Sequence, residues 1–335
     1  RQPNGEPYAD DAAMSLALVR AARRTGIGLT LLPVLYEGNG FGGIAPRPEQ
    51  RRFVVGVDAL LDLVAKLRRE CASHAVRAGL AIHSLRAVSP ASIDAALDRL
   101  QSIDATAPIH IHVAEQEREV EECMAWSGQR SVEWLLDHVA LDARWCLVHA
   151  THMNDREVRA AARTGAVAGL CPTTEANLGD GVFDGVGWQA ADGAFGLGSD
   201  SNVCTDAFAE IAMLEYSQRL ARKRRNVLAT AAQPDVATAI LLDAIAGGAQ
   251  ASGRPVAGIA RGQRADFVVL DTSDATLAAL SPAQQLSTHV FARNPRAPHA
   301  VCVGGQWQVT DGHHPLEERA AQRFAEVRAT LLAST

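Results

Sequence analysis

Short apolar segments rich in β-branched residues alternate with amphipathic helical segments over most of this chain. Six of the apolar segments have the length of a strand: 28–35, 79–83, 109–113, 145–149, 166–171 and 195–197. Continuous apolar runs, as opposed to alternating apolar and polar residues, indicate strands that are covered on both faces. Since helical patterns separate most of these strands, the sequence predicts right-handed βαβ units and a parallel sheet.

Two folds are compatible with this alternation, an open doubly wound sheet and a closed (β/α)8 TIM-type barrel. No G-x-G-x-x-G motif opens a helix, so the dinucleotide-binding form of the open sheet is unsupported. Polar residues stand instead at, or just after, the carboxyl ends of four different strands: His83, His112, His149 and Asp200. Barrel enzymes build their active sites at that end of the strands, and we therefore predict an α/β fold with a TIM-type barrel.

The composition is that of a globular chain and restricts its partners. The 335 residues contain 32 Lys and Arg against 38 Asp and Glu, which gives a net charge of −6. An acidic surface does not attract nucleic acid or anionic membranes, and no run approaches the ~20 apolar residues that a membrane span needs. The six cysteines form no C-x-x-C pair, which favours a reducing cytoplasm. A nucleophilic role stays open for Cys146, which is close in sequence to His149.

The pattern changes after residue 253. Strand-like segments become short, and Gly304-Gly305 between two of them is a hairpin signal. We predict a barrel of βα units over residues 1–253, a small β-sandwich portion over 254–315 and a C-terminal helix in 316–335.

The most informative local motif is His110-Ile-His112-Val-Ala-Glu115. Residues two apart on a strand share a face, so both imidazoles point the same way. On their own they could be ordinary strand-end histidines with satisfied hydrogen bonds. Glu115, however, lies where the strand turns into its helix, and a carboxylic acid near a metal-bound water can transfer protons.

Further candidates follow three other strands. His149 ends an apolar strand, whereas Asp200, in a Gly-Ser-Asp-Ser turn, could serve chemistry or simply cap the next helix. Imidazoles and carboxylates together are ligands that suit Zn²⁺. Arg86, three residues after His83, could hold a substrate carboxylate with its forked guanidinium, or could pair with a neighbouring acid at the surface.

In this order, His112, Glu115, His149 and the Gly-Ser-Asp200 turn resemble the single-metal deaminase branch of the amidohydrolase superfamily. Residues 262–271 and 303–305 look like the small β-sandwich of that superfamily. A closer resemblance, over essentially the whole chain, is to the formimidoylglutamate deiminase family. It rests on the stretches LLPVLY (31–36), FGG (41–43), HSLRAV (83–88), HIHVAEQ (110–116), AWSG (125–128), WCLVHATH (145–152) and TEANLGDG (174–181).

This resemblance implies a cofactor and a role for each candidate residue. His112 and Asp200 would ligate one zinc ion or another divalent metal, His149 would polarise the attacking water, and Asp200 would accept its proton. Glu115 would protonate the imine nitrogen, which leaves as ammonia, while His83 and Arg86 would hold a carboxylate of the anionic substrate, N-formimino-L-glutamate. The expected products, in histidine degradation, are N-formyl-L-glutamate and ammonia. Barrels of this family often pair, so the resemblance also allows a homodimer.

One family feature has no counterpart in the sequence. The family carries a His-x-His pair, two further metal ligands, on its first barrel strand, and no such pair precedes His83. A zinc site has about four ligand positions, of which this chain supplies two. We therefore expect about two further βα units and the two remaining ligands to precede Arg1 in a longer polypeptide.

Two alternatives stay open beside this deiminase. One is another amidohydrolase deaminase that acts on a purine, a pyrimidine or a related amidine, for which replacement of Arg86 would affect substrate binding little. The other is a metal-free, non-catalytic homologue, which metal analysis would identify.

Overall fold

Six parallel strands form the central sheet of the computed structural model, which describes residues 1–2, 4–71, 76–292 and 298–333. In spatial order they are β2 (Val34–Leu35), β4 (Leu80–Ile82), β5 (Ile109–Val113), β6 (Trp145–His149), β7 (Val167–Leu170) and β8 (Phe195–Leu197). Spatial order therefore follows chain order, with β2 and β8 at the two edges. This is the strand arrangement of a TIM-type barrel, and all six predicted strands are confirmed.

The first predicted strand, 28–35, is interrupted. It forms β1 (Leu29–Leu31) and β2, which pair in parallel with β3 (Val76–Ala78) and β4. Pro33 has no N–H to give to a ladder, and this interrupts the strand. The register is the same on both sides of the break, because the Ala81 N–H still donates to the carbonyl of Pro33 at 2.9 Å.

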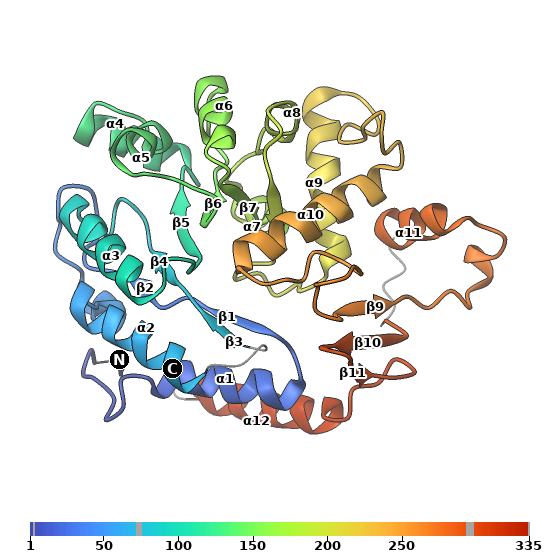
Figure 1. Cartoon of the computed structure of the whole chain (residues 1–335), viewed down its shortest axis with the longest axis horizontal. Helices are drawn as coiled ribbons and strands as arrows, with labels where there is room; N and C mark the ends of the chain where they lie inside the picture. The colour runs from blue at the N-terminus through green and yellow to red at the C-terminus, as the bar shows by residue number, and fades with distance from the viewer. Residues whose placement is uncertain (3, 72–75, 293–297, 334–335) are drawn as a thin grey trace.

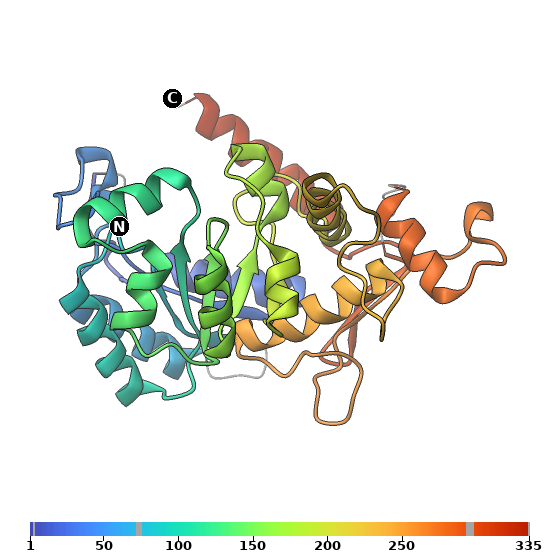
Figure 2. The same cartoon turned by 90° about the horizontal axis from the view of Figure 1, so that it is seen from above.

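Helices lie around the outside of these strands (Figures 1 and 2). They are α1 (Ala13–Thr25), α2 (Val57–Glu70), α3 (Pro90–Ile103), α4 (Glu117–Ser127), α5 (Ser131–His138), α6 (Asp155–Arg163), α7 (Pro172–Leu178), α8 (Gly185–Ala190), α9 (Ala207–Arg222) and α10 (Val236–Ser252). Amphipathic patterns in the sequence predict helices over residues 131–138 and near 155–163, and α5 and α6 have these bounds. A third such pattern begins at about residue 52, but α2 begins at Val57, because Pro48–Phe53 form a separate 3₁₀ helix.

The main core lies between the strands and this layer of helices. Along β5, Ile109, Ile111 and Val113 are buried in it, whereas His110 and His112 lie on the other face, as predicted. His110 donates its Nε2 proton to the carbonyl of Ala251 at 2.8 Å, next to the end of α10. His110 is therefore an ordinary core histidine with a satisfied hydrogen bond.

The C-terminal part forms an antiparallel sheet of β9 (Phe267–Val269), β10 (Ala300–Val303) and β11 (Gln306–Val309), beside the barrel in Figure 1. Gly304 and Gly305, with φ of 59° and 78°, make the predicted hairpin turn. Helix α11 (Pro282–Phe291) lies between β9 and β10 in sequence, and α12 (Glu317–Ala333) is the predicted last helix. The domain boundaries at residues 253 and 315 stay predictions. Within the described ranges, no helix has both the length and the apolar content to cross a bilayer.

Candidate active site

The backbone is strained where strands β5, β6 and β8 end. Positive φ angles occur at four non-glycine residues there: Ala114 (51°), His149 (67°), Ala150 (51°) and Asp200 (52°). For a residue with a Cβ this conformation costs roughly 1–2 kcal/mol, and such residues cluster at active sites. The strained backbone is therefore independent evidence for a functional site at the carboxyl edge of the sheet, where the sequence predicts the active site.

The three predicted histidines meet at this edge. The ring centroids of His83 and His112 are 5.3 Å apart, and those of His112 and His149 are 5.7 Å apart. The Nδ1 of His112 lies 2.7 Å from the carbonyl oxygen of His83. A carbonyl only accepts hydrogen bonds, so this Nδ1 carries the proton and the Nε2 of His112 keeps its lone pair.

His149 lies between two carboxylates. Its Nδ1 donates to Glu175 Oε1 at 3.2 Å, and its Nε2 is 3.8 Å from Glu115 Oε1. Burial lowers the pKa of His149, but the Glu175 hydrogen bond and the charges of Glu115, Glu175 and Asp200 together raise this pKa above its ordinary value. The site thus holds the imidazole in a fixed orientation with Nε2 facing Glu115.

Two buried carboxylates that the sequence analysis missed support these residues. Glu175, on α7, also accepts the backbone N–H of Cys171 at 2.9 Å. Glu119, on α4, accepts the backbone N–H groups of Ala114 and Glu115. The available sequence signal was their position in the first turn of a helix that directly follows a strand of the sheet.

Asp200 is the most solvent-exposed of the predicted site residues. Its side chain is exposed, and it makes no hydrogen bond or ion pair with any described residue. Its charge nonetheless contributes to the raised pKa of His149, which places the two groups in the same electrostatic environment. The Asp200 carboxylate is therefore available to a ligand, because no described side chain forms a hydrogen bond or ion pair with it.

His83 and Arg86 border the site on the side of β4. The His83 ring contacts the edge of Tyr36, with centroids 4.7 Å apart, and burial together with the charges of His112 and Arg86 lowers the pKa of His83 to about 4. Arg86 lines a cavity of about 450 Å³ beside Trp126. It has no ion pair with any residue that the structure describes, so the alternative of a surface pair with a neighbouring acid is not realised there.

The donors at this edge fit a divalent cation. Metal-bound histidines usually donate one ring N–H to a carbonyl or carboxylate and bind through the other nitrogen, and His112 has this arrangement. The free carboxylate of Asp200 is a second ligand of the type that Zn²⁺ accepts. His112 and Asp200 thus provide two of the about four ligand positions that the resemblance requires.

The cysteines contribute support rather than chemistry. Ligand-type atoms of His149, Cys171 and Glu175 lie within 4.8 Å of one another, the one such set of three within the described part of the chain. Glu175 is already occupied by two donors, however, and burial raises the pKa of the Cys171 thiol. Burial also raises the pKa of Cys146 to about 12, which argues against the nucleophilic role that the sequence left open.

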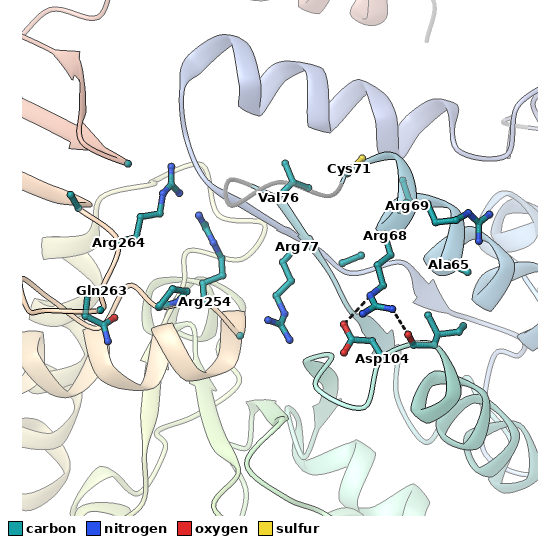
Figure 3. A pocket seen from close by; sticks show the side chains of 18 residues that line it. Ala65, Arg68, Arg69, Cys71, Val76, Arg77, Asp104, Arg254, Gln263 and Arg264 are labelled. Atoms are coloured by element: carbon teal, nitrogen blue, oxygen red, sulfur yellow. Dashed lines mark hydrogen bonds and ion pairs between the residues drawn. The ribbon is translucent and has the colours of Figure 1, made fainter.

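A larger cavity than the one beside Arg86 lies at the opposite end of the strands. It has a volume of about 1390 Å³ and lies between β3, the end of α10 and the C-terminal sheet (Figure 3). Arginines dominate its lining: Arg68, Arg69, Arg77, Arg254 and Arg264. Arg68 pairs with Asp104 at 3.2 Å, as Figure 3 shows. None of the predicted site residues lines this cavity, so size alone does not identify the active site.

Comparison with known proteins agrees with this geometry. The sequence profile of the amidohydrolase family matches residues 13–308. Formimidoylglutamate deiminase of Pseudomonas aeruginosa is 48% identical over 331 residues, which are 98% of this chain and 72% of that protein. A crystal structure of an amidohydrolase from Brucella melitensis superposes with a TM-score of 0.91 at 44% identity, covering 98% of this chain and 72% of that one.

A more distant solved structure has the same fold. It is atrazine chlorohydrolase from Arthrobacter aurescens TC1 complexed with zinc, with a TM-score of 0.78 at 20% identity over 94% of this chain and 69% of that one. The family profile and the two closer relatives cover nearly all the strands and helices described above. The chain therefore belongs to the amidohydrolase family, a family of hydrolases.

Proposed function

We propose that this chain hydrolyses N-formimino-L-glutamate to N-formyl-L-glutamate and ammonia, a step of histidine degradation. The observation that carries the proposal is Arg86, which lies beside His83, lines the cavity and forms no ion pair or hydrogen bond with a described residue, so that its guanidinium can bind an anionic substrate. The 48% identity to a formimidoylglutamate deiminase supports the same substrate.

Each polar side chain of the site has a role in this reaction. Arg86 and His83 bind a carboxylate of the glutamate moiety and so place the formimino carbon at the carboxyl edge of the sheet. His149, oriented by Glu175, hydrogen-bonds the attacking water through Nε2. Asp200 accepts a proton from that water, and Glu115 delivers protons to the imine nitrogen, first as the water adds and again as this nitrogen leaves as ammonia. The formimino carbon gains an oxygen while its bond to the departing ammonia breaks.

A divalent cation, most simply zinc, completes this site, and His112 and Asp200 would hold it. The structural relative with bound zinc supports that choice of ion. When bound, such an ion would lower the pKa of water to roughly 7 and so would supply a nucleophile at neutral pH. Where the two further ligands that the resemblance implies are present, about one ion per chain is expected in protein prepared without chelator. Absence of the ion from such protein would favour the alternative of a metal-free, non-catalytic homologue.

We further propose that the enzyme works in the cytoplasm on this small anionic substrate, without nucleic acid or membrane partners, and can form a homodimer. All six cysteines are free thiols, which is usual for proteins of a reducing compartment.

Ammonia release from a panel of substrates tests the proposal. We expect turnover of N-formimino-L-glutamate and turnover at least about 100-fold slower for adenosine, guanine and cytosine, which lack the carboxylates that Arg86 recognises. Faster release from a nucleobase would instead support the alternative deaminase. Loss of activity after dialysis against a chelator, and its recovery with Zn²⁺, would support the metal assignment.

A further inference from the structure

Glu115 stands on a turn of the backbone that needs support. Strand β5 ends at Val113, and Ala114 adopts a φ of 51° before the chain reaches Glu115. The carboxylate of Glu115 itself faces His149, with Oε1 3.8 Å from Nε2. Because an alanine disfavours this conformation, other groups must hold the turn.

The carboxylate of Glu119 holds this turn. Its side chain is only 2% exposed, and both carboxylate oxygens bind the turn. Oε1 accepts the backbone N–H of Ala114 at 2.8 Å, and Oε2 accepts the backbone N–H of Glu115 at 3.2 Å. Two bonds from one buried carboxylate to two successive N–H groups fix the peptide planes on either side of Ala114.

Ordinary helix capping does not account for this arrangement. Glu119 is the third residue of α4, a position from which glutamate commonly bonds back to the N–H of the N-cap residue. The N-cap of α4 is Gln116, yet Glu119 reaches past it to the two preceding residues. In α6 the equivalent residue, Glu157, is also buried but makes the usual bond, to the N–H of the N-cap Asn154 at 2.8 Å.

The residue after Glu115 is held as well. The side-chain amide of Gln116 donates to Asp180 Oδ1 at 2.9 Å, which ties the turn to the loop that follows α7. Asp180 is buried and accepts a second bond, from His152 Nε2 to its carbonyl at 2.6 Å. Glu115 therefore lies between two fixed points of the backbone.

We propose that Glu119 is a positioning residue that keeps the Glu115 carboxylate within reach of His149. The inference rests on the function proposed above, in which Glu115 transfers protons. Glu119 acts mainly through the backbone and contacts no reacting atom, so its loss lowers the rate of the chemical step. Because its charge also interacts with Arg86, loss of that charge changes KM as well, but less than kcat.

The test compares Glu119→Gln with the matched variant Glu157→Gln. The amide presents an NH2 group to one of the two backbone N–H groups, so one bond is lost. We expect Glu119→Gln to lower kcat about 10- to 100-fold with KM within about threefold, and Glu157→Gln to lower kcat less than about twofold. Hydrogen exchange should become faster at the amides of Ala114 and Glu115 in Glu119→Gln, and at that of Asn154 in Glu157→Gln.

Two outcomes overturn the proposal: a kcat of Glu119→Gln equal to that of Glu157→Gln, or unchanged exchange at Ala114 and Glu115. If Glu119→Gln does not fold, the double variant with Ala114→Gly replaces it, because glycine adopts this φ without a Cβ clash. The double variant should fold and keep the low kcat. If the unmodified chain releases no ammonia, the proposed function fails, and the exchange rates alone then decide whether Glu119 holds the turn.

Discussion

Replacement of Arg86 by methionine removes the guanidinium that we assign to the substrate carboxylate and keeps a side chain of similar length. Arg86 lines the cavity of about 450 Å³ and forms no ion pair or hydrogen bond with a described residue, so the change breaks no such contact of the free protein there, although it removes a positive charge that acts on the buried Glu119. A forked guanidinium–carboxylate contact contributes about 1.5–3 kcal/mol. At a factor of ten for each 1.4 kcal/mol, KM should rise about 10- to 150-fold.

Steady-state ammonia release with N-formimino-L-glutamate and with its bis-amide, which lacks both carboxylates, measures this effect. The bis-amide should bind the variant and the parent protein about equally, because its interaction with Arg86 is already weak. Arg99→Met is the matched control, since Arg99 pairs with Asp58 and Asp62 at 2.6 and 2.5 Å on the outer surface and should leave KM unchanged. A rise in KM below about threefold, or an equal rise for the bis-amide, would refute the assignment of Arg86.

Three further predictions concern the support of the site and the packing of the barrel. Glu175→Gln should lower kcat about 10- to 100-fold, because His149 loses the acceptor that orients it; a kcat within twofold of the parent value would contradict this. Gly247→Ala should lower the free energy of unfolding, measured in urea, by about 1–3 kcal/mol, because the added Cβ would lie 2.0 Å from the Phe195 carbonyl oxygen. The matched variant Gly248→Ala places its Cβ where no atom lies within 4 Å, and it should stabilise α10 by up to about 1 kcal/mol. Iodoacetamide at pH 8 should leave the activity intact and label the partly exposed Cys204, because the pKa of Cys146, raised to about 12, keeps that thiol protonated until the pH approaches this value; inactivation that follows modification of Cys146 would overturn this.

The strands and the residues at their ends were predictable because a strand that is buried on both faces consists of consecutive apolar residues, a pattern visible in the sequence. A parallel strand covered by helices is a continuous apolar run, and the polar residue that ends it stands out. His149 ends such a run, whereas His112 lies within the alternating strand 109–113, and the structure brings their rings together. Helices α5 and α6 were equally clear, since each is amphipathic and has one face on the core.

The supporting carboxylates were not predictable from the pattern. Glu119 and Glu175 stand near helix starts, where acidic residues are common on the surface, and only the structure places them in the interior. Helix α10 was missed for the opposite reason. It packs against β7, β8, α9 and α11 and is apolar on several sides, so it lacks the periodic contrast that identifies a surface helix.

The central claim is that water attacks the formimino carbon and ammonia leaves, and product analysis in H₂¹⁸O tests it most directly. Reaction of the protein with N-formimino-L-glutamate should yield one ammonia for each N-formyl-L-glutamate, with one ¹⁸O in the formyl group. Release of glutamate and formamide, in which the other C–N bond is cleaved, or no release of ammonia by metal-loaded protein, would contradict the account.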